Sequence, residues 1–176
     1  TTAEATKATT KKAELVLPTT QNTSGKVQIQ TVSSSASYKF NSYIITSSKG
    51  ESIIVDPTCM PSKDTIDLKP AAIVCTHSHP DHTEPSFTDS YDCQKILYTK
   101  ADIKTTDFHI YSILSSHNGD EITEGNENYI MVFEVDGLRI AHMGDLGQNV
   151  LTNEQLKELG NIDIAFMQFD NSYSDI

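Results

Sequence analysis

The nine residues CTHSHPDHT, numbers 75–83, hold the densest group of metal-ligand side chains in the sequence. Three of the six histidines and one aspartate lie between His77 and His82. The segment AAIVCT, 71–76, leads into them and is a short, continuous apolar run that predicts a buried strand. Polar side chains gathered where a buried strand ends indicate a functional site, because loops on a rigid scaffold commonly carry binding and catalytic groups.

The spacing within this segment favours metal binding. His77 and His79 are two residues apart, so in an extended segment both imidazoles point the same way and can reach one ion. Pro80 then bends the chain, and Asp81 and His82 follow at once and can face a second ion. Imidazole and carboxylate suit Zn²⁺ and its neighbours Mn²⁺, Fe²⁺ and Co²⁺. A solvated loop that is rich in histidine by chance is the alternative, and this density of ligands after a buried strand disfavours it.

The rest of the sequence predicts a strand-rich protein. Gly50 and the pair Asp136-Gly137 mark hairpin turns. Only TNEQLKEL, 152–159, predicts a clear helix, with Thr152 as its N-cap. Alternating or continuous apolar patterns predict further strands at 26–32, 38–46, 52–58, 95–99, 108–114, 128–135, 138–143 and 162–169.

THSHPDHT resembles the HxHxDH signature of the metallo-β-lactamase-fold hydrolases. SIIVDPT before it, and SSHNGDEI, NYIMVFEVDGLRIAHMGDLG and GNIDIAFMQF after it, resemble the neighbouring blocks of that superfamily in the same order. Within the superfamily the sequence looks similar to the branch of L-ascorbate-6-phosphate lactonase-like proteins and related metal-dependent hydrolases. The resemblance covers residues 26–176 and implies an α/β (α+β) fold, the αββα sandwich, here without its C-terminal part.

This resemblance also implies a binuclear metal centre with zinc as the expected metal, two ions in all, and with Mn or Fe as alternatives. Asp81 is the expected catalytic residue as well as a ligand, because it would orient the attacking water. Asp56, in VDPT, would support the metal loop through hydrogen bonds without binding metal itself. The implied ligands are His77, His79 and His117 on the first ion, Asp81 and His82 on the second, and Asp145 as a bridge between them.

The remaining histidines are weaker candidates. His109, in DFHIY, is expected to be an ordinary strand residue. His142 alternates with Ile140 on a predicted strand and is expected to be packed there, although it could orient a ligand. No histidine follows His142, whereas members of the superfamily usually supply a last histidine to the second metal. We therefore expect a chain cut short of the full fold, with three protein ligands on the second ion.

Composition narrows the classes of partner. The 176 residues are expected to form one domain and carry a formal net charge of −11, which disfavours nucleic acid as a partner. No stretch approaches the roughly 20 apolar residues of a membrane-spanning helix. Three cysteines allow at most one disulfide. Residues 1–25 contain eight threonines and no aromatic residue, so they are expected to be a flexible N-terminal tether. A tether of this kind often follows an export signal, which favours an exported or cell-envelope location, and an ordinary disordered terminus is the equal alternative.

These features lead to one main functional hypothesis: a metal-dependent hydrolase that activates water to attack a small ester, lactone, amide or phosphoester. The 35 residues from His82 to His117 resemble the lactonase-like branch more than true β-lactamases. The second hypothesis is a non-catalytic metal-binding relative that acts as a binding or cell-envelope protein, and a third, weaker one is an adaptor whose globular part only carries the fold. The sequence leaves the substrate, the metal and the oligomeric state open.

Overall fold

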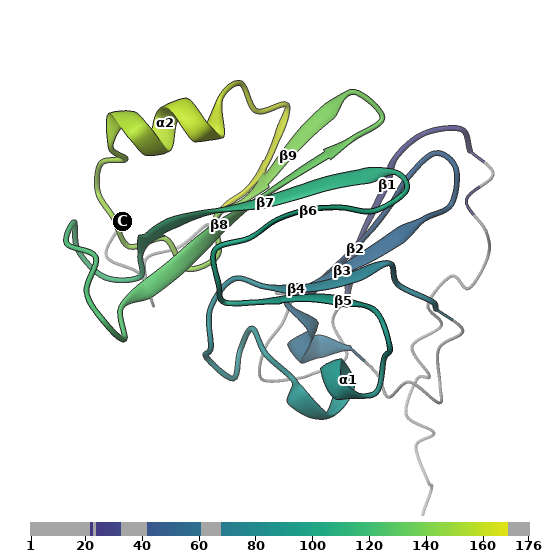
Figure 1. The fold of residues 1–176 in the computed structure, drawn as a ribbon, viewed down its shortest axis with the longest axis horizontal. Coiled ribbons are helices and arrows are strands. Elements are labelled where there is room, and N and C mark those ends of the chain that lie inside the picture. The colour runs from purple at the N-terminus through teal and green to yellow at the C-terminus, as the bar shows by residue number, and fades with distance from the viewer. Residues whose placement is uncertain (1–21, 23, 33–41, 61–67, 169–176) are drawn as a thin grey trace, which may run out of the picture.

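The computed structural model describes residues 22, 24–32, 42–60 and 68–168. Within them, two mixed β-sheets pack against each other (Figure 1). The first sheet has the strand order β1 (Gln28–Val32), β2 (Ser42–Thr46), β3 (Ser52–Val55), β4 (Ala72–Cys75) and β5 (Gln94–Leu97). The second sheet has the order β10 (Ile164–Phe166), β9 (Leu138–His142), β8 (Glu127–Val135), β7 (Phe108–Ser116) and β6 (Asp102–Lys104).

Strand direction decides which loops meet. β3, β4 and β5 are parallel, so their carboxyl ends lie at one edge of the first sheet. In the second sheet β7 is antiparallel to β8 and β8 to β9, so β7 and β9 run the same way and end at one edge. β10 is parallel to β9 and ends there too. The segments that follow β4, β7, β9 and β10 can therefore converge, and these are the segments rich in polar ligands.

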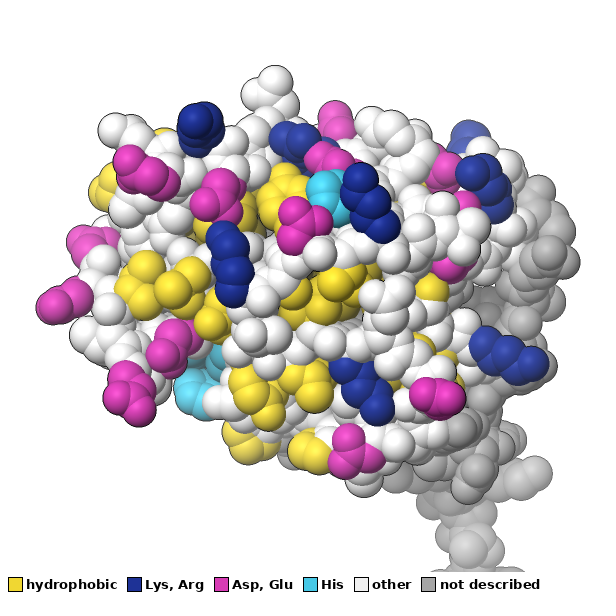
Figure 2. All heavy atoms as spheres, in the orientation of Figure 1, with side chains coloured by type: hydrophobic (Ala, Val, Ile, Leu, Met, Phe, Trp, Pro, Cys, Tyr) yellow, Lys and Arg dark blue, Asp and Glu magenta, His cyan; other side chains and the backbone are white. Residues whose placement is uncertain are grey.

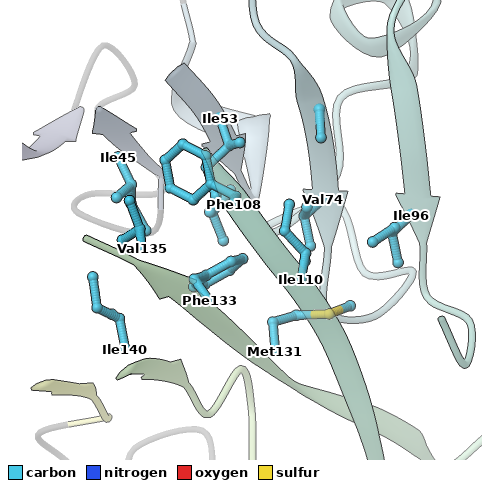
Figure 3. Packing of buried hydrophobic residues seen from close by; sticks show 12 residues of the cluster. Ile45, Ile53, Val74, Ile96, Phe108, Ile110, Met131, Phe133, Val135 and Ile140 are labelled. Carbon is cyan, nitrogen blue, oxygen red and sulfur yellow. The ribbon is translucent and has the colours of Figure 1, made fainter. Parts of the chain in front are cut away.

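The main core lies between the two sheets (Figure 3). Ile45, Ile53 and Val74 of the first sheet face Phe108 and Phe133 of the second, and all are buried. Alternation along each strand sends the other apolar residues to the outer faces. There the short helix α1 (Pro85–Asp89) covers the first sheet and α2 (Asn153–Leu159) covers the second (Figure 1). The order of layers is helix, sheet, sheet, helix.

Several local predictions are confirmed. Asp136 and Gly137 both have positive φ, 51° and 81°, and form the tight turn between β8 and β9. Gly50 lies in the turn between β2 and β3. Helix α2 starts with the Thr152 capping box. The apolar run 71–76 contains the buried strand β4.

Three short elements were not predicted: α1, β6 and the 3-10 helix η1 (Pro57–Cys59). Each has only three to five residues, too few to show a hydrophobic period. The predicted tether, 1–25, falls almost wholly outside the described residues. Asn22 is described, and its side-chain amide donates to the carbonyl of Ser47 at 2.7 Å. In the described part of the chain, no helix has the length and apolar character needed to cross a bilayer.

Candidate metal centre

The six implied ligands come from three segments that the sheets bring together. Four of them lie in the loop after β4, one follows β7 directly, and one lies three residues beyond the end of β9. All three segments leave the matching edges of the two sheets, so ligands 68 residues apart in the chain meet in space. The residues that converge are His77, His79, Asp81 and His82 from the loop, His117 after β7, and Asp145 after β9.

One group has the composition expected of the first metal site. His77, His79, His117 and Asp145 each offer one ligand atom, and these atoms all lie within 4.8 Å of one another. The Nε2 atoms of His77 and His117 are each 3.5 Å from Asp145 Oδ2. Both nitrogens are buried, and neither has a hydrogen-bond partner among the residues that the structure describes. Buried polar atoms are normally satisfied, and a metal ion among these nitrogens would satisfy them. The residues therefore fit a bound divalent cation.

A second group adjoins the first. His77, Asp81 and His82 also offer ligand atoms within 4.8 Å of one another. His82 Nε2 is 3.9 Å from Asp81 Oδ2 and 3.1 Å from Asp145 Oδ1. Asp145 thus turns one carboxylate oxygen toward His77 and the other toward His82. This is the arrangement that a bridging carboxylate requires.

Asp56 holds the metal loop from beneath. It is fully buried, and its Oδ1 accepts a hydrogen bond from the Thr76 backbone N–H at 2.8 Å. Its Oδ2 accepts from His82 Nδ1 at 2.7 Å, which leaves His82 Nε2 directed at Asp145. Fixing the tautomer of a ligand histidine in this way is a common task of a carboxylate next to a metal site.

His142 packs inside the protein, as expected, and also contacts this carboxylate. Its Nδ1 accepts from the Gly144 N–H at 3.0 Å, so a neutral ring carries its proton on Nε2, which lies 3.0 Å from Asp56 Oδ2. Asp56, His82 and His142 form a close cluster, but their contacts of 2.7 and 3.0 Å are hydrogen-bond lengths. Such contacts are typical of a supporting network, in which Asp56 directs the free nitrogen of His82 at Asp145.

The pKa shifts of His77 and His82 have opposite directions. Burial lowers the pKa of His77 below its ordinary value, so this imidazole is neutral and available as a ligand at pH 7. Burial alone would also lower the pKa of His82, but Asp56 and Asp145 raise it to about 10. Burial would raise the pKa of Asp145, yet its contacts with His77 and His82 outweigh this effect and lower the pKa. Without metal, a proton on His82 thus sits between two carboxylates, where a cation can replace it.

Asn128 is an important residue that the sequence did not reveal. It is fully buried, and its Oδ1 accepts from the backbone N–H of Asp145 at 3.1 Å. Its amide group donates to Met143 O at 2.8 Å and to Ser115 Oγ at 2.9 Å. Asn128 therefore fixes the backbone of the segment that carries Asp145. Its sequence signal is weak, because it is one of several polar residues near the ends of β8.

Two glycines allow the ligand segments to pack closely. Gly144 has φ +59°, and a Cβ there would lie 2.3 Å from Asn128 Oδ1. A Cβ on Gly147 would lie 2.1 Å from the carbonyl oxygen of His117. The Gly147 N–H donates to Ser116 O at 3.0 Å, and the Gly119 N–H donates to Gly147 O at 3.1 Å. The segments bearing His117 and Asp145 are thereby joined backbone to backbone.

His109 lies outside this centre. It is a residue of β7, and its ring forms hydrogen bonds with Glu134 and Asp102, each at 2.8 Å. Asp102 and Glu134 belong to β6 and β8, the neighbouring strands of the same sheet. The ring therefore links three strands and binds none of the centre's residues.

A family model described as a beta-lactamase superfamily domain matches residues 34–174. The chain belongs to the metallo-β-lactamase superfamily. The predicted fold class is confirmed: two mixed sheets with few helices form the α/β sandwich of this superfamily. A search of curated proteins finds no significant match.

Solved structures agree on the fold. A candidate Zn-dependent hydrolase of the superfamily from Thermotoga maritima is 21% identical, with a TM-score of 0.53, over 77% of this chain and 60% of its own. A candidate metal-dependent hydrolase from Parabacteroides distasonis is 21% identical, with a TM-score of 0.56, over 84% of this chain and 72% of its own. The diiron β-hydroxylase CmlA from Streptomyces venezuelae is 10% identical, with a TM-score of 0.55, over 79% of this chain and 33% of its own.

The similarity to these solved structures shows the fold and does not specify a reaction or a substrate. The chain spans 60% of the length of the Thermotoga protein, and identities near 20% carry the fold alone. The fold is that of metallo-hydrolases, and the His/Asp groups supply candidate metal-binding residues. Because one neighbour is a diiron protein, the fold by itself does not select zinc.

Proposed function

We propose that this chain is a metal-dependent hydrolase that binds two divalent cations and cleaves a small ester, lactone, amide or phosphoester. The observation that carries the proposal is the position of Asp145. Its Oδ2 is 3.5 Å from the unpartnered Nε2 atoms of His77 and His117, and its Oδ1 is 3.1 Å from His82 Nε2. A carboxylate with ligand nitrogens on both sides is suited to hold two cations next to each other.

The exposure of each ligand side chain indicates its place in the proposed centre. Buried His77 and partly buried His117 would hold the first ion together with His79, and buried His82 the second together with Asp81. Bound ions would supply a water molecule of lowered pKa and would polarise an oxygen of the substrate. His79 is exposed and Asp81 is half-buried, so these two residues mark the side that a substrate can approach. Asp81 would orient the attacking water from there.

Surface charge supports a small substrate over nucleic acid. The formal net charge is −11, and on the face in Figure 2 Lys and Arg side chains are scattered among acidic, apolar and neutral ones. Such a surface repels a phosphate backbone. Zinc is the proposed metal, because three imidazoles and a carboxylate suit it, with Mn or Fe as alternatives. The spacing of His82 and His117 supports a lactonase-like reaction.

The test is hydrolysis by the metal-loaded chain with variants at the exposed ligands. Zn- or Mn-loaded protein is assayed on activated carboxylic esters, lactones and a phosphodiester. We expect His79→Ala and Asp81→Ala to abolish hydrolysis while circular dichroism shows a folded protein, because neither side chain is part of the core. Asp92→Ala, at an exposed aspartate, is the matched control. Full activity in the His79 and Asp81 variants, or after chelation of the metal, contradicts the proposal.

The non-catalytic alternative is not favoured. It rests on the missing last histidine and the tether-like N-terminus, whereas the six implied ligands lie in two adjoining groups, each with ligand atoms within 4.8 Å of one another. Metal binding without any turnover on the substrate panel is the result that would restore it.

A further inference from the structure

We propose that Gln168 supplies the second metal site with a fourth protein ligand, the oxygen of its side-chain amide. This inference rests on the proposed function, because it requires a cation between His82 and Asp145. Its starting point is that, among the described residues, the family resemblance assigns three side chains to the second cation, those of Asp81, His82 and Asp145. Gln168 is the described residue that reaches the same side of Asp145.

Strand pairing places Gln168 there. β10 is parallel to β9, and Phe166 lies opposite His142 in the register. The Met143 N–H donates to Phe166 O at 3.0 Å, so the pairing continues to the last residue of β10. Asp145 lies three residues beyond His142, and Gln168 lies two residues beyond Phe166. The two side chains therefore meet where the strands end.

The contact with Asp145 identifies which ion Gln168 would serve. Gln168 Nε2 donates a hydrogen bond to Asp145 Oδ1. That oxygen is the one 3.1 Å from His82 Nε2, whereas Oδ2 faces the Nε2 atoms of His77 and His117. Gln168 is therefore on the second-site side of the bridging carboxylate.

The other atom of the same amide is unsatisfied. Gln168 Oε1 is buried and has no hydrogen-bond partner among the described residues. Burying an amide oxygen without a partner is unfavourable. A half turn about the Cγ–Cδ bond exchanges Oε1 and Nε2, so the amide can present its oxygen to the place that its NH₂ group now occupies. A cation between Asp145 Oδ1 and the amide would satisfy both oxygens, and this ion would replace the donated hydrogen bond.

This ligand gives the two sites different chemistry. The first site would have three imidazole nitrogens and one carboxylate oxygen. The second would have one imidazole nitrogen, from His82, and three oxygens, from Asp81, Asp145 and Gln168. Carboxylate and carbonyl oxygens suit harder ions such as Mn²⁺, while imidazole suits zinc. We therefore infer that the second site accepts Mn²⁺ more readily, relative to Zn²⁺, than the first site does.

Metal content and metal titration test this without an assay of activity. Chelator-stripped protein is dialysed against Zn²⁺ or Mn²⁺, analysed for metal per chain, and titrated by calorimetry. Wild-type protein is expected to bind two ions, and Gln168→Ala to keep the first and bind the second at least about tenfold more weakly. Gln168→Glu is expected to keep both, because a carboxylate can replace the amide as a ligand. Met167→Ala, at the exposed neighbouring residue, is the matched control, and thermal unfolding verifies that every variant is folded.

The outcomes separate the inference from the proposed function. If Gln168→Ala binds two ions with wild-type affinity, Gln168 is not a ligand, and the binuclear hydrolase still stands. If Gln168→Glu loses the second ion, the amide acts as a donor to Asp145, since glutamate cannot donate and repels that carboxylate, and the inference is overturned. If wild-type protein itself binds fewer than two ions, the proposed binuclear centre fails, and the role of Gln168 fails with it.

Discussion

Asp56 and His82 form the contact on which the metal loop rests: Asp56 Oδ2 accepts a hydrogen bond from His82 Nδ1 at 2.7 Å, and both side chains are buried. Asp56 directly follows β3, and its backbone lies in the left-handed region with a φ of 47°. Its carboxylate reaches the loop after β4. This contact therefore leaves Nε2 as the nitrogen of His82 that is directed at Asp145. The same carboxylate accepts from Thr76, so it fixes both the start and the end of the HxHxDH loop.

Replacing Asp56 with Asn should weaken metal binding while leaving all six ligands in place. Asparagine has nearly the same shape but lacks the charge that holds His82. We expect the affinity for the second ion to fall by about 10- to 100-fold, as is typical when the partner of a metal ligand is lost. Calorimetric titration of the stripped protein measures this. Asp92→Asn, at an exposed aspartate, is the control, and equal affinities in wild type and Asp56→Asn would remove Asp56 from the centre.

Gly147→Ala should separate the two ligand segments. Its Cβ would lie 2.1 Å from the His117 carbonyl oxygen, a backbone atom that cannot rotate away. We expect a loss of about 1–3 kcal/mol in the free energy of unfolding, together with weaker metal binding. Urea unfolding and metal titration report the two effects. Gly125→Ala is the comparison, because its Cβ would meet nothing within 4 Å and its positive φ of 80° makes the change costly for stability at a place outside the two ligand segments. Similar metal affinities in both variants would show that this close approach does not position the site.

Asn128→Ala should destabilise the protein more than its size suggests. The change leaves the Asp145 N–H and the Met143 carbonyl without their partner in a fully buried place. Each buried group left unpaired costs about 1–3 kcal/mol. Urea unfolding measures the change, with Asn153→Ala on the exposed start of α2 as the matched control. A loss no larger than in that control would mean that the Asn128 bonds do not stabilise the fold.

His109 should make stability depend on pH. The hydrogen bond from His109 to Glu134, with that to Asp102, raises its pKa above the ordinary 6.5. A raised pKa in the folded state favours the protonated form, so this stabilisation is complete below about pH 6.5 and is lost as the pH rises through the folded value. We expect His109→Gln to lower the free energy of unfolding more at about pH 5.5 than at about pH 9. Urea titrations of metal-free protein at both pH values test this, and a difference that does not vary with pH contradicts it.

Bound metal should stabilise the folded chain. The ligands come from three segments that meet only on folding, so the ions bind the folded state in preference to the unfolded one. At a free ion concentration of about 100 times the dissociation constant, each site adds about 2.7 kcal/mol. Thermal unfolding with and without a chelator measures the gain. His79→Ala, an exposed ligand, should reduce it, and an unfolding temperature that does not respond to metal would argue against a preformed centre.

The sequence predicted the framework because its signals are local. A continuous apolar run predicts a buried strand, and Asp136-Gly137 predicts a tight turn. Both predictions depend only on residues that are neighbours in the sequence. The ligands in the loop after β4 were visible for the same reason: they lie within six residues of one another. His117 and Asp145 were reached only through the family resemblance, because single residues at strand ends carry no pattern of their own.

The residues that position the candidate ligands could be found only from the tertiary structure. Asn128 and Gln168 look ordinary in the sequence, and their hydrogen bonds to Asp145 span 17 and 23 residues. The role of Gly147 depends on how closely the His117 segment approaches, and the contact of His142 with Asp56 depends on the packing of the two sheets. Such contacts form when strands that are distant in the sequence end at the same edge of the sheets. The hydrophobic periodicity of the sequence does not predict them. The sequence by itself determined the strands and most of the candidate metal ligands, while the packing of the two sheets decided how those side chains are held together.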